Sequence, residues 1–116
     1  MSPSILVLGI SYLKDVGDMR YAPFLSIEKE LKNRSSKLMT YDPFIKKAEY
    51  DTNSWEDIIK TKFDIIIIGS PHTIFIENQN IEEISLLNKY AILIDPFNIA
   101  SNLKINNKTI TIGNGN

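Results

Sequence analysis

Charged side chains that could bind a ligand or a cation gather between residues 9 and 23, directly after an apolar run. Asp15 and Asp18 stand three residues apart, and Arg20 follows them. Two carboxylates in a loop could hold a hard cation such as Mg²⁺ or Ca²⁺. They could instead accept hydrogen bonds from loop amides and pair with the Arg20 guanidinium. We favour the second interpretation and predict no metal site.

His72 is the only histidine in the chain, and there is no cysteine. Without cysteine the chain offers no thiolate nucleophile, no disulfide and no sulfur-bound metal. No carboxylate stands at metal-ligand spacing from His72. The ring could act as an acid or a base, or it could brace its loop, and we expect the bracing role. Asp42 ends a predicted strand, and we expect it to cap the turn that follows.

Two apolar segments must position the loops that carry these side chains. Residues 5–10 are almost entirely apolar, and residues 65–68 are four consecutive isoleucines. Apolar runs without polar alternation are typical of central strands in a parallel sheet, where both faces are buried. The loops at 11–22 and 70–73 follow these two strands.

Helix and strand patterns alternate along the rest of the chain. Pro23 suits a first helical position, and Phe24, Ile27 and Leu31 recur at helical spacing as the expected buried face. Ser54, with an acid three residues later, has the capping-box pattern that starts a short helix. The other expected elements are strands at 37–41, 91–94 and 109–112 and a helix at 80–88.

This alternation predicts an α/β fold, namely a Rossmann-like three-layer sandwich with a mainly parallel five-stranded sheet. If the two most hydrophobic strands are neighbours at the centre, right-handed crossovers give the strand order 2-1-3-4-5. The order then reverses between the first and third strands, and open α/β sheets bind ligands at such a switch point. The loops at 11–22 and 70–73 therefore flank the expected ligand crevice.

Length and charge limit the class of protein further. The chain has 116 residues, 43% of them hydrophobic, and a formal net charge of −1. The length predicts a single domain over residues 1–116, and the charge gives no electrostatic footprint for nucleic acid. No apolar segment approaches membrane-spanning length, and residues 1–4 lack the basic start of a signal peptide. We expect a cytoplasmic domain with neither nucleic acid nor membrane as a partner.

Three phosphate-binding classes lack their signatures in this chain. Gly9 is not followed by Gly-x-Gly-x-x-Gly or Gly-Lys-Ser/Thr patterns, so the domain should not bind a dinucleotide in the usual way by itself. A phospho-accepting receiver domain would need an acid after the third strand, where Ser70 stands. A flavodoxin-like phosphate loop is disfavoured because Asp15 and Asp18 would repel the phosphate.

The segment at 9–23 reads Gly-Ile-Ser-Tyr-Leu-Lys-Asp-Val-Gly-Asp-Met-Arg-Tyr-Ala-Pro. It resembles the Gly-Leu-x-Tyr/Phe-Lys-x-Asp-x-x-Asp-x-Arg-Glu-Ser-Pro signature that opens the C-terminal, nucleotide-sugar-binding domain of the UDP-glucose/GDP-mannose dehydrogenase family. Weaker matches follow in the right order, at residues 41–43, at His72 with Phe75, at Asp95 with Asn98, and at 113–115. The resemblance therefore covers nearly the whole chain.

Members of this family oxidise a sugar C6 hydroxyl, or its equivalent, to a carboxylate with two NAD molecules. The resemblance implies that an N-terminal domain binds NAD, a helical middle domain mediates dimerisation, and a domain like this one covers the nucleotide end of the substrate. The family's catalytic cysteine and lysine lie outside this domain, so we expect no catalytic residue and no turnover here. The chain would be a detached C-terminal piece of a larger dehydrogenase, with a UDP-sugar as ligand and the other two domains as partners.

The resemblance also implies site residues. Tyr12 would lie beside the nucleotide, and Arg20 would reach toward the NAD held by the N-terminal domain. Leu13 replaces the family's substrate-binding lysine, with Lys14 next to it, and Phe97 replaces a basic residue that contacts the nucleotide in relatives. A charge-assisted hydrogen bond contributes roughly 1.5–3 kcal/mol. We therefore expect the isolated domain to bind UDP weakly or not at all.

Two functions remain open from the sequence. The retained acidic residues, Arg20 and Pro23 favour the nucleotide-sugar-binding domain of an NAD-dependent sugar dehydrogenase. Leu13 and Phe97 favour an α/β binding or interaction module that descended from such a domain and lost its ligand.

Overall fold

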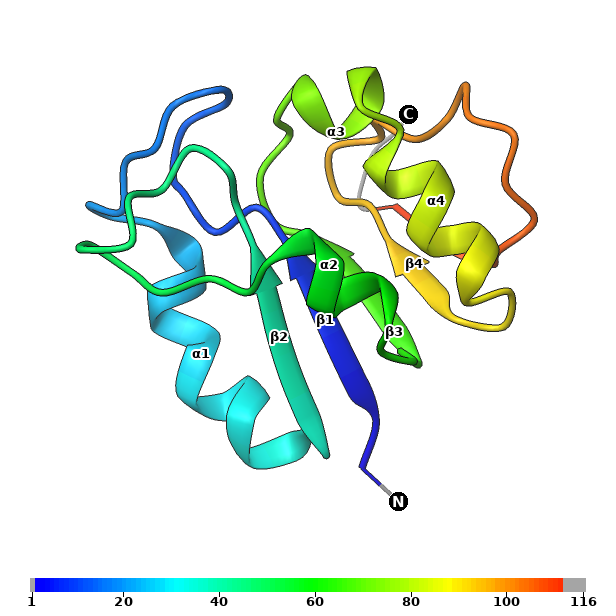
Figure 1. Ribbon diagram of the computed structural model, residues 1–116, viewed down its shortest axis with the longest axis horizontal. Coiled ribbons are helices and arrows are strands. Elements are labelled where there is room, and N and C mark those ends of the chain that lie inside the picture. The colour runs from blue at the N-terminus through cyan, green and yellow to red at the C-terminus, as the bar shows by residue number, and fades with distance from the viewer. Residues whose placement is uncertain (1, 112–116) are drawn as a thin grey trace.

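The computed structural model describes residues 2–111, and its sheet has the predicted order. The strands are β1 (Ser4–Leu8), β2 (Lys37–Tyr41), β3 (Ile65–Ile68), β4 (Ile92–Ile94) and β5 (Thr109–Ile110). They form one sheet in the order β2-β1-β3-β4-β5, and all four described pairings are parallel. The labelled strands point to one edge of the sheet, from which the loop that follows β1 emerges (Figure 1).

The apolar runs of β1 and β3 place these two strands at the centre, where side chains on both faces leave water. Leu6 pairs with Ile66 on β3 and Met39 on β2. Leu6 and Leu8 have no exposed surface, and Ile5 and Val7 on the opposite face are only 4% and 2% exposed. Full burial of an aliphatic side chain stabilises the fold by about 1.5–3 kcal/mol. These strands therefore supply the central part of the core.

Helix α1 (Pro23–Arg34) covers the face of the sheet that carries Ile5 and Val7. It begins at Pro23 as predicted, and Phe24 is buried in the core of that face. The prediction that Ile27 is buried is wrong, because its side chain is 46% exposed. Glu28 turns toward the protein instead and accepts a hydrogen bond from the Tyr50 hydroxyl. The segment after β2 brings Tyr50 over the helix, which helical periodicity alone does not reveal.

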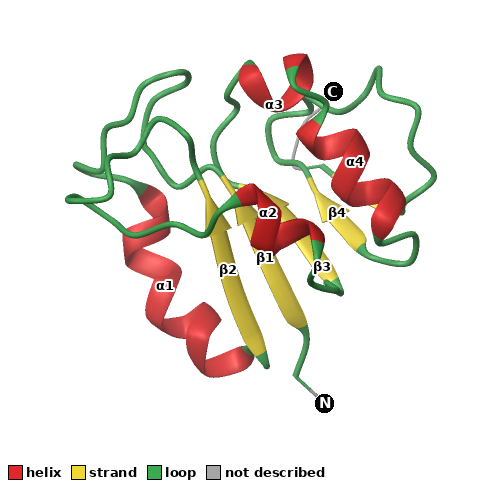
Figure 2. Cartoon of the chain, viewed as in Figure 1, coloured by secondary structure: helices red, strands yellow, loops and turns green. Residues whose placement is uncertain are grey.

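Three helices cover the other face: α2 (Trp55–Ile59), α3 (Ile74–Glu77) and α4 (Asn80–Leu87). Helix α2 crosses in front of the strands in Figure 2. Its predicted cap is confirmed, because Ser54 Oγ accepts from the Asp57 amide at 3.1 Å. Helix α3 was not predicted, since a single helical turn has no periodicity to detect. Its Phe75 has no exposed surface and joins the core of this face.

Three predicted strands are shorter than expected, β4 only by its first residue, Ala91. The first strand ends at Leu8 rather than at residue 10, because Gly9 leaves extended geometry with φ of +86°. The last ends at Ile110 within the described part, while residue 112 and the resemblance at 113–115 lie outside the described residues. Over residues 2–111, the helices are too short or too polar to cross a bilayer.

Candidate functional site

The loops after β1, β2 and β3 converge at the carboxyl edge of the sheet. Gly9 and Ser70 are in close contact there, and a Cβ at Gly9 would lie 2.6 Å from Ser70 Cβ. The Ser70 hydroxyl donates to the Ser11 carbonyl at 2.7 Å. Because Gly9 also has a positive φ, glycine is the residue that allows these two loops to cross. The predicted switch-point loops therefore do lie together.

Asp42, at the end of β2, ties these loops together. Its Oδ2 accepts from the amides of Ile10 and Ser11 at 2.9 and 3.1 Å, from Ser11 Oγ at 2.6 Å and from His72 Nε2 at 3.0 Å. Its Oδ1 accepts from the Phe44 amide at 3.1 Å, which is the predicted turn cap. Burial acts to raise the pKa of Asp42, but the bonds from His72, Ser11 and Ile10 outweigh burial and lower it. Asp42 is therefore a buried carboxylate that joins two loops, a role the sequence did not indicate.

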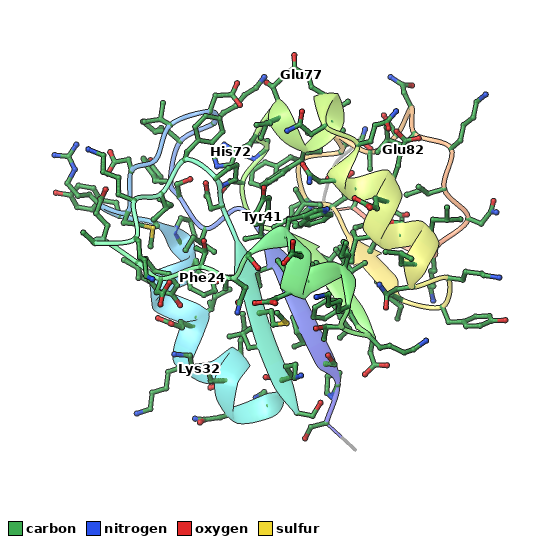
Figure 3. The ribbon with its side chains drawn as sticks, in the orientation of Figure 1. Phe24, Lys32, Tyr41, His72, Glu77 and Glu82 are labelled. Atoms are coloured by element: carbon green, nitrogen blue, oxygen red, sulfur yellow. The ribbon has the colours of Figure 1, made fainter. Side chains whose placement is uncertain are left out.

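His72 braces the loops from the other side. Its Nδ1 accepts a hydrogen bond from the Asp15 amide at 2.7 Å, so the ring proton must be on Nε2. Nε2 in turn faces Ser11 Oγ at 2.8 Å and Asp42 Oδ2. The side chain lies beneath the loops at the top of Figure 3 and has no exposed surface. Ser11, His72 and Asp42 are the residue types of a nucleophilic triad, but one imidazole nitrogen faces both partners, and all three residues are almost fully buried.

The two acidic residues of the long loop have partners within the protein. Asp15 accepts from the Thr73 amide at 2.6 Å and from Thr73 Oγ1 at 2.7 Å, and these bonds lower the pKa of Asp15. Asp18 pairs with Arg20, with 3.1 Å between its Oδ1 and the guanidinium Nε, and this contact lowers the pKa of Asp18. The Arg20 pairing agrees with the prediction, whereas Asp15 bonds to the neighbouring loop rather than its own. In the described part of the chain no three potential ligands converge on a metal site.

A pocket of about 220 Å³ lies beside the braced loops. Its lining residues are Lys14, Pro71, His72, Thr73, Ile76 and Ile99. Pockets of about 300 and 210 Å³ lie elsewhere, at the segments that precede β3 and β4 and beside α4. We place the candidate site at the first pocket because parallel sheets bind ligands at the carboxyl ends of their strands.

The structure brings one of the five predicted site residues to this pocket. Lys14 lines it, but Leu13 does not, although the two are adjacent in sequence. Tyr12 and Phe97 are 51% and 48% exposed and lie outside its lining. The Arg20 side chain is 83% exposed beside Asp18.

The other five lining residues were not predicted as site residues. Pro71, His72 and Thr73 belong to the predicted loop at 70–73, so their position was available from the sequence. Ile76 belongs to the unpredicted helix α3, and Ile99 follows the turn after β4, where Asp95 accepts its amide at 3.1 Å. The aspartate after β4 was the signal for that turn, because Asp side chains commonly bond to backbone amides ahead of them.

Comparison with known proteins gives consistent matches. Residues 6–102 match the model of the UDP-glucose/GDP-mannose dehydrogenase family, UDP binding domain. A UDP-N-acetyl-D-mannosamine dehydrogenase of Methanococcus aeolicus is 34% identical over 96 residues, which cover 81% of this chain and 22% of the relative. The enzyme of that name from Methanococcus vannielii is 33% identical over an alignment 118 positions long, which covers 97% of this chain and 27% of the relative.

Solved structures show the same fold. A UDP-D-ManNAc dehydrogenase from Pyrococcus horikoshii matches with a TM-score of 0.71 and 27% identity, over 94% of this chain and 25% of that one. The UDP-N-acetyl-mannosamine dehydrogenase from Staphylococcus aureus matches with a TM-score of 0.69 over 94% of this chain and 26% of that one. At 20% identity, this second likeness concerns the fold alone.

These observations define a Rossmann-like domain, with a parallel sheet covered by helices and a pocket at the carboxyl edge of that sheet. The chain belongs to the UDP-glucose/GDP-mannose dehydrogenase family and corresponds to its UDP binding domain. It spans about a quarter of the length of the curated relatives it matches.

Proposed function

We propose that this chain binds the nucleotide end of a UDP-sugar within an NAD-dependent nucleotide-sugar 6-dehydrogenase and has no turnover by itself. The observation that carries the proposal is the family match over residues 6–102, combined with a pocket at the predicted crevice that Lys14 lines. The names of the relatives, UDP-N-acetyl-D-mannosamine dehydrogenases, support a UDP-linked N-acetyl sugar as the whole substrate. The remaining domains of the dehydrogenase are the partners of this one.

Lys14 takes the part of the missing family lysine at position 13. Its ammonium group supplies positive charge at the pocket, where Ile76 and Ile99 provide apolar surface. A diphosphate needs such a cation, and a lysine can serve it as a point charge. Tyr12 lies half-exposed two residues before Lys14 and offers an aromatic face for the base.

The residues after β1 do not fit a dinucleotide. A dinucleotide fold places its pyrophosphate at the start of a helix that follows the first strand directly. Here α1 begins only at Pro23, and the Asp42 carboxylate accepts the amides of Ile10 and Ser11 at the turn. NAD therefore belongs to another domain of the dehydrogenase, and the exposed Arg20 is this chain's contact toward it.

Titration of the ¹⁵N-labelled chain with UDP, followed by NMR, tests the proposal. We expect binding in the millimolar range, about −4 kcal/mol, because positions 13 and 97 lack the family's cations, Lys14 replaces only one of them, and the other domains are absent. Perturbed amides should cluster at residues 12–15, 71–76 and 97–99. Lys14→Met should weaken binding by about tenfold or more, the loss expected for one charge-assisted bond. The exposed Lys104→Met is the matched control and should leave the affinity unchanged.

The second candidate function is an interaction module that has lost its ligand. The exposed apolar side chains of Leu13 and Phe97, at positions where the family carries cations, favour it. In that case UDP at about 10 mM, well above an ordinary millimolar dissociation constant, would perturb no amide. That result would overturn the nucleotide-binding proposal.

A further inference from the structure

The loop that carries Lys14 contains a backbone conformation that residues other than glycine seldom adopt. Asp15 has a left-handed backbone, with φ of +60°. This region is costly for residues other than glycine, although aspartate tolerates it better than most. Three hydrogen bonds hold Asp15 there: its amide donates to His72 Nδ1, and its carboxylate accepts from the amide and hydroxyl of Thr73.

We propose that His72 is a positioning residue for the candidate nucleotide site: by accepting the Asp15 amide, it turns Lys14 rather than Leu13 toward the pocket. The inference rests on the proposed function. Asp15 directly follows Lys14, so its backbone direction sets where the lysine side chain leaves the loop. Lys14 lines the pocket and Leu13 does not. His72 borders the pocket but has no exposed surface, and both its ring nitrogens face protein atoms, so it acts through the loop rather than on a ligand.

His72 makes a second contact that could explain its presence in another way. Its Nε2–H donates toward Asp42 Oδ2 at 3.0 Å, and this bond stabilises a buried carboxylate. A role limited to stability would depend on the Nε2 side of the ring. The positioning role depends on the Nδ1 side, which faces Asp15. Since the two contacts use different nitrogen atoms, substitutions can separate them.

Asparagine and glutamine can each reproduce one of the two contacts that the imidazole ring makes. In His72→Asn the amide oxygen replaces Nδ1 as an acceptor for the Asp15 amide, and the donor toward Asp42 is lost. In His72→Gln the longer side chain carries its NH₂ group to the position of Nε2, and the acceptor near Asp15 is lost. The titratable and charged groups that face the ring are Asp42, Asp15 and, across the pocket, Lys14. None of them is changed in either variant.

The main readout is the hydrogen exchange of the Asp15 amide, measured by NMR on the full chain. We expect His72→Gln to exchange this amide about tenfold faster than the unchanged protein, as the loss of one hydrogen bond implies. His72→Asn should keep the exchange within about threefold, a difference too small for a lost hydrogen bond. UDP affinity should follow the same order, falling about tenfold in His72→Gln only. Urea midpoints should fall in both variants, so stability alone cannot produce this pattern.

If either variant fails to fold, a measurement on the unchanged protein still tests the role of His72. In the ¹⁵N-labelled chain, Nδ1 of His72 should be unprotonated and should show scalar coupling across its hydrogen bond to the Asp15 amide. A proton on Nδ1 would overturn the proposal. Protection of the Asp15 amide that survives in His72→Gln but is lost in His72→Asn would also overturn it. If UDP perturbs no amide of the unchanged protein, the proposed function fails, while the exchange pattern still decides the role of His72.

Discussion

Replacement of Asp42 should be the most damaging single change at the carboxyl edge of the sheet. In Asp42→Ala, five donors lose their acceptor: the amides of Ile10, Ser11 and Phe44, the Ser11 hydroxyl and His72 Nε2–H. A buried donor without an acceptor costs about 1–3 kcal/mol. The Ser11 hydroxyl and a water molecule can provide new hydrogen bonds for some of these donors. Five times the penalty for one donor is therefore an upper limit.

The measured loss of a buried charged partner is a better guide to the size of the effect. Such changes destabilise proteins by about 3–5 kcal/mol. A chain of 116 residues has a free energy of unfolding of roughly 6–17 kcal/mol, so this is a large fraction of the total. Asp42→Asn keeps one oxygen but sets its NH₂ group against a donor on the other side. We expect it to cost about 1–3 kcal/mol, the penalty for one unsatisfied group.

Urea unfolding followed by the fluorescence of Trp55 measures this effect. The Trp55 ring lies 5.0 Å from that of Tyr41 and its Nε1 donates to Glu83, so it reports on the packed state. With a slope of about 1–3 kcal/mol per molar, the midpoint of Asp42→Ala should fall by at least about 1 M. The exposed Asp51→Ala is the matched control and should change stability by less than about 0.5 kcal/mol. Equal midpoints for Asp42→Ala and Asp51→Ala would refute the reasoning.

Two other changes test the same edge of the sheet. Gly17→Ala places a Cβ 1.8 Å from the Phe44 carbonyl oxygen, so the loop must shift. We expect the free energy of unfolding, measured in urea, to fall by about 1–3 kcal/mol. A fall below about 0.5 kcal/mol, the range of an ordinary surface change, would show that the loops do not touch there. Stability should also depend on acid, because the hydrogen bonds to Asp42 outweigh its burial and hold its folded pKa below the usual value of an aspartate. This contribution is complete above the unfolded pKa and is lost as the pH falls through the folded pKa, so the urea midpoint should decline below about pH 4. The decline should be shallower in Asp42→Asn, and equal slopes would contradict the assignment.

The order and direction of the strands could be predicted from the sequence because they depend on hydrophobic burial. The isoleucines at 65–68 and the apolar run of β1 have no place except the centre of a sheet covered on both faces. The start of α1 at Pro23 and the Ser54 cap were predictable for a local reason. Each depends on a backbone preference within a few residues.

The errors concern elements whose surroundings come from distant parts of the chain. Helix α3 is a single turn held by the burial of Phe75, and no local pattern indicates it. Ile27 is exposed because Tyr50, in the segment after β2, packs on Phe24 and binds Glu28. Periodicity indicates that a helix has an apolar side, but it does not show which neighbour covers that side.

The sequence by itself determined the family, the parallel sheet and the loop that carries the candidate site. Only the tertiary structure decided that Lys14 lines the pocket and that Leu13 does not. The physical reason is that Asp15 is held in a left-handed conformation by His72 and Thr73, from 57 and 58 residues away. A side chain's direction in a long loop depends on such contacts, which exist only once β1 and β3 are neighbours.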